Sequence, residues 1–143
     1  NYANAGYTVI KDVLPQGDEV IDGGKLYNAN CVACHQTTGL GVPGAFPPLV
    51  DSHFVLSDNT ERMASIMLYG LMGPITVSGK TYNGVMTPMG GILNDDQLAA
   101  VATYVRNSWG NKASAVTPDV FAKMRKKWGS RAQLTIAEIG DAP

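Results

Sequence analysis

Two cysteines and a histidine stand close together in the first third of the chain, as Cys31, Cys34 and His35. The C-x-x-C-H spacing is typical of a site where two thiols add across the vinyl groups of a porphyrin, which leaves the histidine beside the iron. A zinc site would need every Cys and His in the chain. A redox dithiol would favour a βαβ context, whereas residues 36–48 are rich in Gly and Pro. The pattern therefore predicts one covalent haem c with His35 as an iron ligand.

A histidine that binds iron needs a partner for its other ring nitrogen, since a hydrogen bond from Nδ1 fixes the orientation of the ring. Residues 36–51 are predicted to form a loop, because Gly and Pro recur there. This loop follows the histidine directly and would wrap the same side of the cofactor. We expect a backbone carbonyl in the loop, that of Pro47 or Pro48, to accept the proton of His35 Nδ1.

The ligand at the sixth position of the iron decides between a carrier and an enzyme. Met86 and Met89 lie in a stretch with Gly and Pro, and His53 is the second histidine of the chain. A thioether is a soft ligand that favours ferrous iron and raises the reduction potential. We expect Met86 to bind the iron. The alternatives are Met89, His53 and an open position.

The composition is typical of a soluble globular protein and not of a membrane-spanning one. The chain has 143 residues, of which 45% are hydrophobic and 16% charged, and no apolar run approaches the ~20 residues of a membrane span. These values predict one soluble domain without a membrane span. No signal peptide is visible. Because a covalent haem implies export, we expect a periplasmic protein whose leader has been removed.

The charges divide the chain unevenly. We divide it into an N-terminal arm (1–17), a haem domain (18–111) and a basic helical tail (112–143). Residues 1–111 hold five Lys or Arg against nine Asp or Glu, a net charge of −4, and residues 112–143 hold six against three, a net charge of +3. This asymmetry favours oriented docking with a charged protein. Nucleic acid is not expected as a partner, because the main body has no basic face.

Helices and one hairpin are predicted around the motif. The helices cover residues 18–30, 57–70 and 94–109, and the hairpin lies within residues 75–82. A fourth helix is expected to begin at Thr117-Pro118 in the tail.

Side-chain patterns refine three of these helices. Asn94 and Gln97 have the spacing of a capping box, whereas Ser57 or Asp58 is expected to cap residues 57–70. In the latter helix, Met63 and Met67 belong to an apolar stripe, which predicts core packing. The pair Gly23 and Gly24 needs an explanation, because glycine within a helix costs about 0.5–1 kcal/mol relative to alanine. Close approach of another helix is the natural explanation.

These features, in this order, resemble a class I cytochrome c over residues 18–110. The resemblance rests on Gly23 and Tyr27 before the cysteine motif, the segment Phe46-Pro-Pro-Leu49, the Met86 loop and a final amphipathic helix. More narrowly, residues 75–86 and 103–111 are similar to cytochrome c modules fused to or partnering periplasmic oxidoreductases, such as copper nitrite reductases and dehydrogenases. Those modules usually have Met-Pro-Pro where this chain has Met86-Thr87-Pro88, which makes Met89 a competitor for the iron.

The resemblance implies an all-α fold in which the first and last helices cross around the haem. A small hairpin would precede the methionine loop, and both ends of the chain would extend beyond the fold. Gly23 would let the helix of Tyr104 approach. The resemblance also implies that four side chains wall the haem: Tyr27, Leu98, Val101 and Tyr104.

The implied function is that of an electron carrier rather than an enzyme. It would move single electrons between a periplasmic dehydrogenase or nitrite-reductase-like enzyme and a second electron-transfer protein or oxidase. A first alternative is the haem subunit of a stable complex with such an enzyme. A second is a haem enzyme or gas sensor with a labile methionine ligand.

Overall fold

The structure is a computed structural model that describes residues 20–142. The predicted arm of residues 1–17 therefore lies outside the described residues. The elements occur in the order α2 (Gly23–Asn30), α3 (Val32–His35), α4 (His53–Leu56), α5 (Glu61–Tyr69), β1 (Leu71–Val77), β2 (Lys80–Met86), α6 (Asp95–Arg106), α7 (Pro118–Trp128), β3 (Leu134–Thr135) and α8 (Ile136–Ile139). Within this range no helix combines the length and apolar character that crossing a bilayer requires.

Helix α6 forms where it was predicted. Asn94 and Gln97 make both bonds of the capping box. The helix ends at Arg106, earlier than expected, and Trp109 and Gly110 beyond it have positive φ angles of 56° and 91°.

The other two predicted helices begin later than expected. Helix α2 starts at Gly23, and the Asp22 side chain accepts a hydrogen bond from the Lys25 N–H. The predicted cap at Ser57 or Asp58 is wrong, since α5 starts at Glu61 after Thr60. The short helix α4 ends at Leu56, so residues 57–60 must connect two helices instead of starting one.

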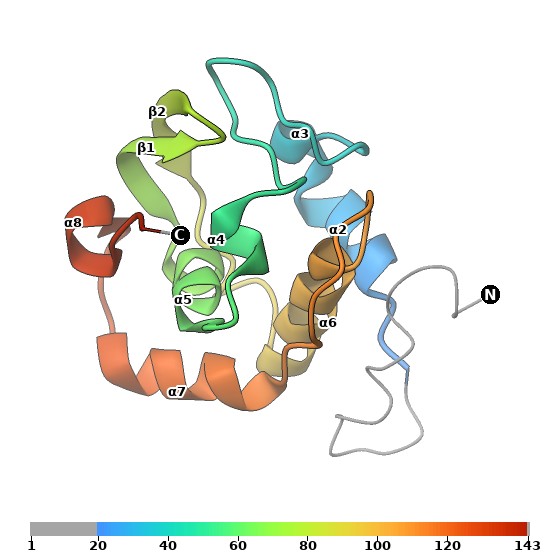
Figure 1. Ribbon diagram of the computed structural model, residues 1–143. Coiled ribbons are helices and arrows are strands. Elements are labelled where there is room, and N and C mark those ends of the chain that lie inside the picture. The colour runs from blue at the N-terminus through green and yellow to red at the C-terminus, as the bar shows by residue number, and fades with distance from the viewer. Residues whose placement is uncertain (1–19, 143) are drawn as a thin grey trace.

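Helices α2 and α6 cross at close range, as predicted (Figure 1). A Cβ atom at Gly23 would overlap the carbonyl oxygen of Ala100, and at Gly24 it would lie 2.9 Å from the Tyr104 ring. The ring centroids of Tyr27 and Tyr104 are 5.6 Å apart. The glycine pair therefore allows two backbones to touch, and an aromatic contact lies beside the crossing.

Strands β1 and β2 form an antiparallel hairpin that is longer than predicted. Ser78 and Gly79 join the strands, and their positive φ angles of 51° and 77° suit a two-residue turn. Met86, expected in a loop, ends β2 opposite Leu71. Strand β3, which was not predicted, pairs in parallel with β1. The fold is thus mainly helical with a three-stranded sheet of order β2-β1-β3.

The segment predicted to be a tail completes the core. Helix α7 begins at Pro118 as predicted and packs against α5 and α6 (Figure 1). Phe121 and Met124 are almost fully buried in the same cluster as Tyr27 and Leu98. The sequence could not show this packing, because an amphipathic helix with a basic face is equally consistent with a solvated arm.

A buried arginine of helix α6 forms hydrogen bonds to helix α4 and to the segment that precedes α7. Arg106 has no exposed surface. Its guanidinium donates to the carbonyl oxygens of Val55 and Ser57 near α4 and to that of Ser114. Burial lowers the pKa of Arg106, although guanidinium remains charged at neutral pH.

Replacing Gly23 tests the helix crossing. The Gly23→Ala variant should lower the free energy of unfolding by about 1–3 kcal/mol, the usual cost of overpacking, because the new methyl group collides with backbone. Chemical denaturation of the holoprotein measures the change. Gly91→Ala is the control, since a Cβ atom there meets nothing within 4 Å. Equal stabilities of the two variants would contradict the close approach.

Candidate haem site

The cysteine motif spans the junction of α2 and α3. Cys31 is the C-cap of α2, and the His35 N–H donates to the Cys31 carbonyl at 3.0 Å, so the motif forms one helical turn. This turn places Cys31, Cys34 and His35 on one wall of a cavity. Burial, with a contribution from Cys34, raises the pKa of the Cys31 thiol to about 11. The thiol is therefore protonated and held against apolar surface.

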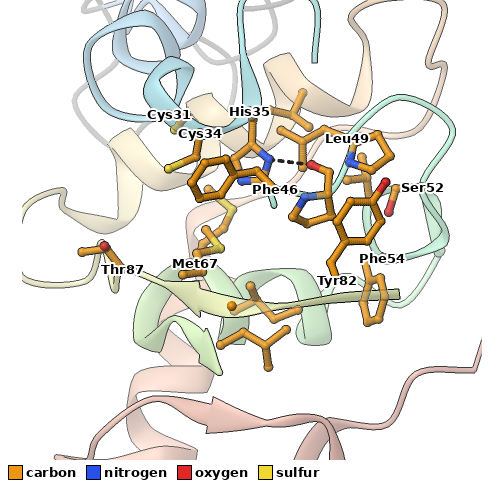
Figure 2. A pocket seen from close by; sticks show the side chains of 18 of the residues that line it. Cys31, Cys34, His35, Phe46, Leu49, Ser52, Phe54, Met67, Tyr82 and Thr87 are labelled. Carbon is orange, nitrogen blue, oxygen red and sulfur yellow. Dashed lines mark hydrogen bonds between the residues drawn. The ribbon is translucent and has the colours of Figure 1, made fainter. Parts of the chain in front are cut away.

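His35 is buried, with 8% of its surface exposed, and its orientation is fixed. Nδ1 lies 2.9 Å from the Pro47 carbonyl oxygen (Figure 2). Of the two candidate carbonyls, that of Pro47 is therefore the acceptor, and both Pro47 and Pro48 line the cavity. Burial lowers the pKa of His35, opposed by the bond to Pro47, so the ring is neutral. A neutral ring that donates from Nδ1 leaves Nε2 free to bind a metal.

Gly41 brings the proximal loop close enough for this bond. Its N–H donates to the His35 carbonyl at 3.0 Å, and its φ angle is +66°. A Cβ atom there would overlap the Phe46 carbonyl oxygen and lie 2.6 Å from that of Pro47. Only glycine adopts this positive φ angle easily and also leaves room for the neighbouring carbonyl groups, because it has no Cβ atom.

Tyr27 holds the residue that follows the histidine. Its hydroxyl donates to the Gln36 carbonyl at 2.6 Å, and burial raises its pKa. Tyr27 also lines the cavity. Tyr104 and Leu98 do not, because Tyr104 lies over α2 at the helix crossing and contacts the ring of Tyr27. From helix α6 the cavity is lined by Val101, which was among the expected wall residues, and by Val105.

The cavity has a volume of about 370 Å³, within the range of roughly 300–1,000 Å³ typical of cofactor sites. The hairpin forms one wall through alternate residues, as a period of two requires. The alternate residues of β1 and β2 on this wall are Leu71, Gly73, Ile75, Val77, Tyr82, Gly84 and Met86, and Val85 also lines the cavity.

The hairpin wall is hollowed at its centre by two glycines. Gly73 pairs with Gly84 across the strands. A Cβ atom at Gly73 would meet nothing within 4 Å, and at Gly84 only the Ala45 carbonyl oxygen at 3.7 Å. No Asp, Glu, Lys or Arg in the described part of the chain lines the cavity. A flat apolar ring attached through Cys31 and Cys34 fits this space.

Four methionines line the cavity: Met63, Met67, Met86 and Met89. Met63 and Met67 belong to the hydrophobic core, as predicted, but also face the cavity. Met89 packs against the same core, and its N–H donates to the Met67 carbonyl at 2.9 Å. His53 is not among the lining residues, and its Nε2 lies 2.7 Å from the Asp141 carbonyl oxygen.

Several lining or supporting residues were missed from the sequence. Ser52 and Tyr82 line the cavity, and both are buried. Trp109 packs on Tyr27 and donates from Nε1 to the Thr37 carbonyl at 2.9 Å. Tyr82 could have been found from the sequence, since it lies on the predicted hairpin. Ser52 and Trp109 lie in connecting segments, and only the tertiary structure shows where those segments run.

A motif of two cysteines and a histidine on the wall of a closely fitting apolar cavity defines a protein that binds haem covalently. Comparison with known proteins identifies the family. The family model described as cytochrome c matches residues 20–109, and the chain belongs to the cytochrome c family. It therefore carries one covalent haem c, at Cys31 and Cys34, and transfers electrons.

Similar proteins include a cytochrome c-552 and cytochrome c subunits of dehydrogenases. Cytochrome c-552 of Thermus thermophilus is 36% identical over 129 residues, which cover 76% of this chain and 97% of that protein. The cytochrome c subunit of the quinone alcohol dehydrogenase of Gluconobacter oxydans is 32% identical over 101 residues, covering 71% of this chain and 21% of the subunit. The gluconate 2-dehydrogenase cytochrome c subunit of Pantoea cypripedii is 31% identical over 144 residues, covering 91% of this chain and 30% of the subunit.

Two glycines of the proximal loop test how the Pro47 carbonyl is positioned. Gly41→Ala and Gly44→Ala both place alanine at positive φ, at a similar cost of about 1–2 kcal/mol. Only Gly41→Ala also displaces the Pro47 carbonyl, because a Cβ atom at Gly44 meets nothing within 4 Å. Gly41→Ala should therefore raise the reduction potential, since an imidazole without this acceptor is a weaker electron donor to ferric iron. Potentiometric titration measures the shift, and equal potentials in the two variants would contradict the role of Gly41.

Proposed function

We propose that the chain is a class I cytochrome c of the periplasm that carries single electrons between a redox enzyme and a second electron-transfer protein or oxidase. The observation that carries this proposal is the chemistry of the cavity. His35 faces apolar side chains and thioethers, and no charged side chain of residues 20–142 lines the space. Without an acid or base beside the iron, the site suits a change of metal charge better than the conversion of a substrate.

We propose His35 and Met86 as the two protein ligands of the iron. Haem supplies the one-electron chemistry when bound, and a His/Met pair stabilises ferrous iron. Met86 is favoured over Met89 because, within residues 20–142, its side chain is not part of the main hydrophobic core or of the small cluster around Phe54, whereas Met89 packs against the core. Strand β2 also fixes the Met86 backbone opposite Leu71. The sheet thus fixes the backbone of Met86, and its side chain remains available to bind iron in the cavity.

Two partner arrangements remain to be distinguished. The match to nearly the full length of a cytochrome c-552 favours a free carrier. The matches to cytochrome c subunits of dehydrogenases favour a haem subunit in a stable complex, although the chain spans only about a fifth to a third of their length. In both arrangements the enzyme supplies or removes electrons and this chain relays them.

Three measurements on the holoprotein test the proposed function. Stopped-flow mixing with a quinone-dependent alcohol dehydrogenase should give rapid reduction of the haem. Elution as a monomer from a sizing column that also contains the dehydrogenase would support the free carrier, and co-elution would support the subunit. Carbon monoxide binding to the reduced protein at neutral pH would contradict both and indicate the gas sensor or haem enzyme.

Replacing each candidate methionine identifies the ligand. Met86→Ala should abolish the sulfur-to-iron charge-transfer band of the ferric protein, lower the reduction potential and allow carbon monoxide to bind, because the iron loses its soft ligand. Met89→Ala is the matched control and should keep the band, since its side chain contributes packing. The opposite result would assign the ligand to Met89.

An exposed valine tests the surface through which electrons pass between the dehydrogenase and the haem. Val85 is 61% exposed and also lines the cavity, so it lies at the opening. Val85→Asp should slow electron exchange with the dehydrogenase about tenfold or more, the factor that corresponds to ~1.4 kcal/mol of docking energy. Ile92→Asp is the control, since Ile92 is equally exposed at 61% and does not line the cavity. Equal rates for the two variants would place the docking surface elsewhere.

A further inference from the structure

The segment that follows Met86 connects the hairpin to α6. Met86 is the last residue of β2, and α6 begins at Asp95, so residues 87–94 form the connection. These residues adopt neither helix nor strand. Such a connection is held in place mainly by the neighbours it contacts, since it lacks the repeated backbone hydrogen bonds of a helix or a strand. Its contacts therefore decide how firmly the Met86 side chain is kept at the cavity.

One side of the segment is bonded to α5 through backbone atoms. The Met89 N–H donates to the Met67 carbonyl at 2.9 Å, and the Gly90 N–H donates to the Leu68 carbonyl at 3.0 Å. A Cβ atom at Gly90 would lie 2.8 Å from the Leu68 carbonyl oxygen, so the two backbones are in close contact. These bonds fix the middle of the segment against α5.

Arg125 of α7 binds the segment and the start of α6 at three points. Its Nη1 donates to the Gly90 carbonyl at 3.0 Å, and its Nη2 donates to the Leu93 carbonyl at 3.2 Å. Its Nε donates to the Asp95 carboxylate at 2.7 Å. Figure 1 shows the start of α6 beside α7. Because a planar guanidinium donates in fixed directions, these bonds hold residues 90–95 in one arrangement.

The bonds to the two carbonyl oxygens matter more than the ion pair. The side chains of Arg125 and Asp95 are 38% and 29% exposed, and an ion pair so open to solvent contributes little by itself. The carbonyl oxygens belong to the backbone of the segment, so the bonds to them constrain its path directly.

In the described part of the chain, no other basic residue of α7 reaches this segment by a hydrogen bond. Lys123 forms its ion pair with Glu61 of α5 at 2.7 Å. The ammonium of Lys127 lies 4.8 Å from the centre of the Trp128 ring. Contact with the segment after Met86 is thus specific to Arg125, and Lys123 offers a matched control on the same helix.

We propose that Arg125 is a positioning residue for the axial methionine and slows the replacement of the Met86 thioether by competing ligands. The inference rests on the proposed ligation by Met86. A competing ligand binds only when the thioether has left the iron, and the segment that follows Met86 shifts with it. Contacts that exist only in the unshifted arrangement favour that arrangement. Helix α7, expected from the sequence to lie in a tail outside the haem domain, thereby helps to stabilise the sixth ligand.

Imidazole binding to the ferric holoprotein tests this role. Imidazole takes the place of a displaced thioether, so its apparent affinity reports how easily the methionine leaves. Arg125→Ala should raise that affinity about tenfold, which corresponds to ~1.4 kcal/mol. Lys123→Ala is the matched control, because it removes an ion pair of the same length, 2.7 Å, that ends on α5 instead. Its affinity should equal that of the wild type.

A second background separates positioning from a general loss of structure. In the Met86→Ala protein no thioether remains to be displaced at this position, so adding Arg125→Ala should leave the imidazole affinity unchanged. An equal rise in both backgrounds, or no rise in the wild-type background, would overturn the proposal. If Arg125→Ala does not fold, Arg125→Lys tests the same bonds and should also raise the affinity, because an ammonium lacks the rigid fork that reaches both carbonyls.

The sulfur-to-iron charge-transfer band distinguishes this inference from the ligand assignment on which it rests. If Met86→Ala retains the band, Met86 is not the ligand and the proposed ligation fails, whatever the effect of Arg125. If Met86→Ala abolishes the band and Arg125→Ala keeps the wild-type affinity for imidazole, only the positioning role fails.

Discussion

The structure depends on shaping an apolar space of about 370 Å³ inside a small chain, into which the haem fits. The hydrophobic effect favours contact between the apolar wall and the cofactor, but it does not by itself fix where each wall lies. Three supports fix the walls. Helices α2 and α6 touch at Gly23, the proximal loop is held by Gly41 and the bond to His35, and the hairpin is backed by β3. Each support involves backbone atoms, whose positions tolerate little change.

Residues that act locally could be predicted from the sequence, because their chemistry depends on spacing alone. The cysteine motif, the capping box at Asn94 and Gln97 and the close approach at Gly23 all follow from short-range patterns. The choice of Pro47 over Pro48 as the acceptor could not be predicted. It depends on the path of a loop that is fixed by Gly41 and by long-range contacts.

Side chains whose role depends on the packing of distant elements were harder to predict. Tyr104 was expected beside the haem and lies at the helix crossing, because α6 turns Val101 and Val105 towards the cavity and Tyr104 towards α2. Ser52 precedes a four-residue helix that has no clear pattern of its own. Phe121 and Met124 sit on an amphipathic helix, and only the completed fold shows that α5 and α6 cover them.

The buried guanidinium of Arg106 has an electrostatic consequence for the metal. It follows Val105, a wall residue, and it donates to the carbonyl of Val55, another wall residue, so a permanent cation stands directly behind the cavity. Within residues 20–142 it forms no ion pair, and Asp58, which is exposed, compensates it only at longer range. When haem occupies the cavity, removing an electron from its iron would add positive charge on the side of the wall that this fixed cation backs. The buried guanidinium would therefore favour the ferrous state.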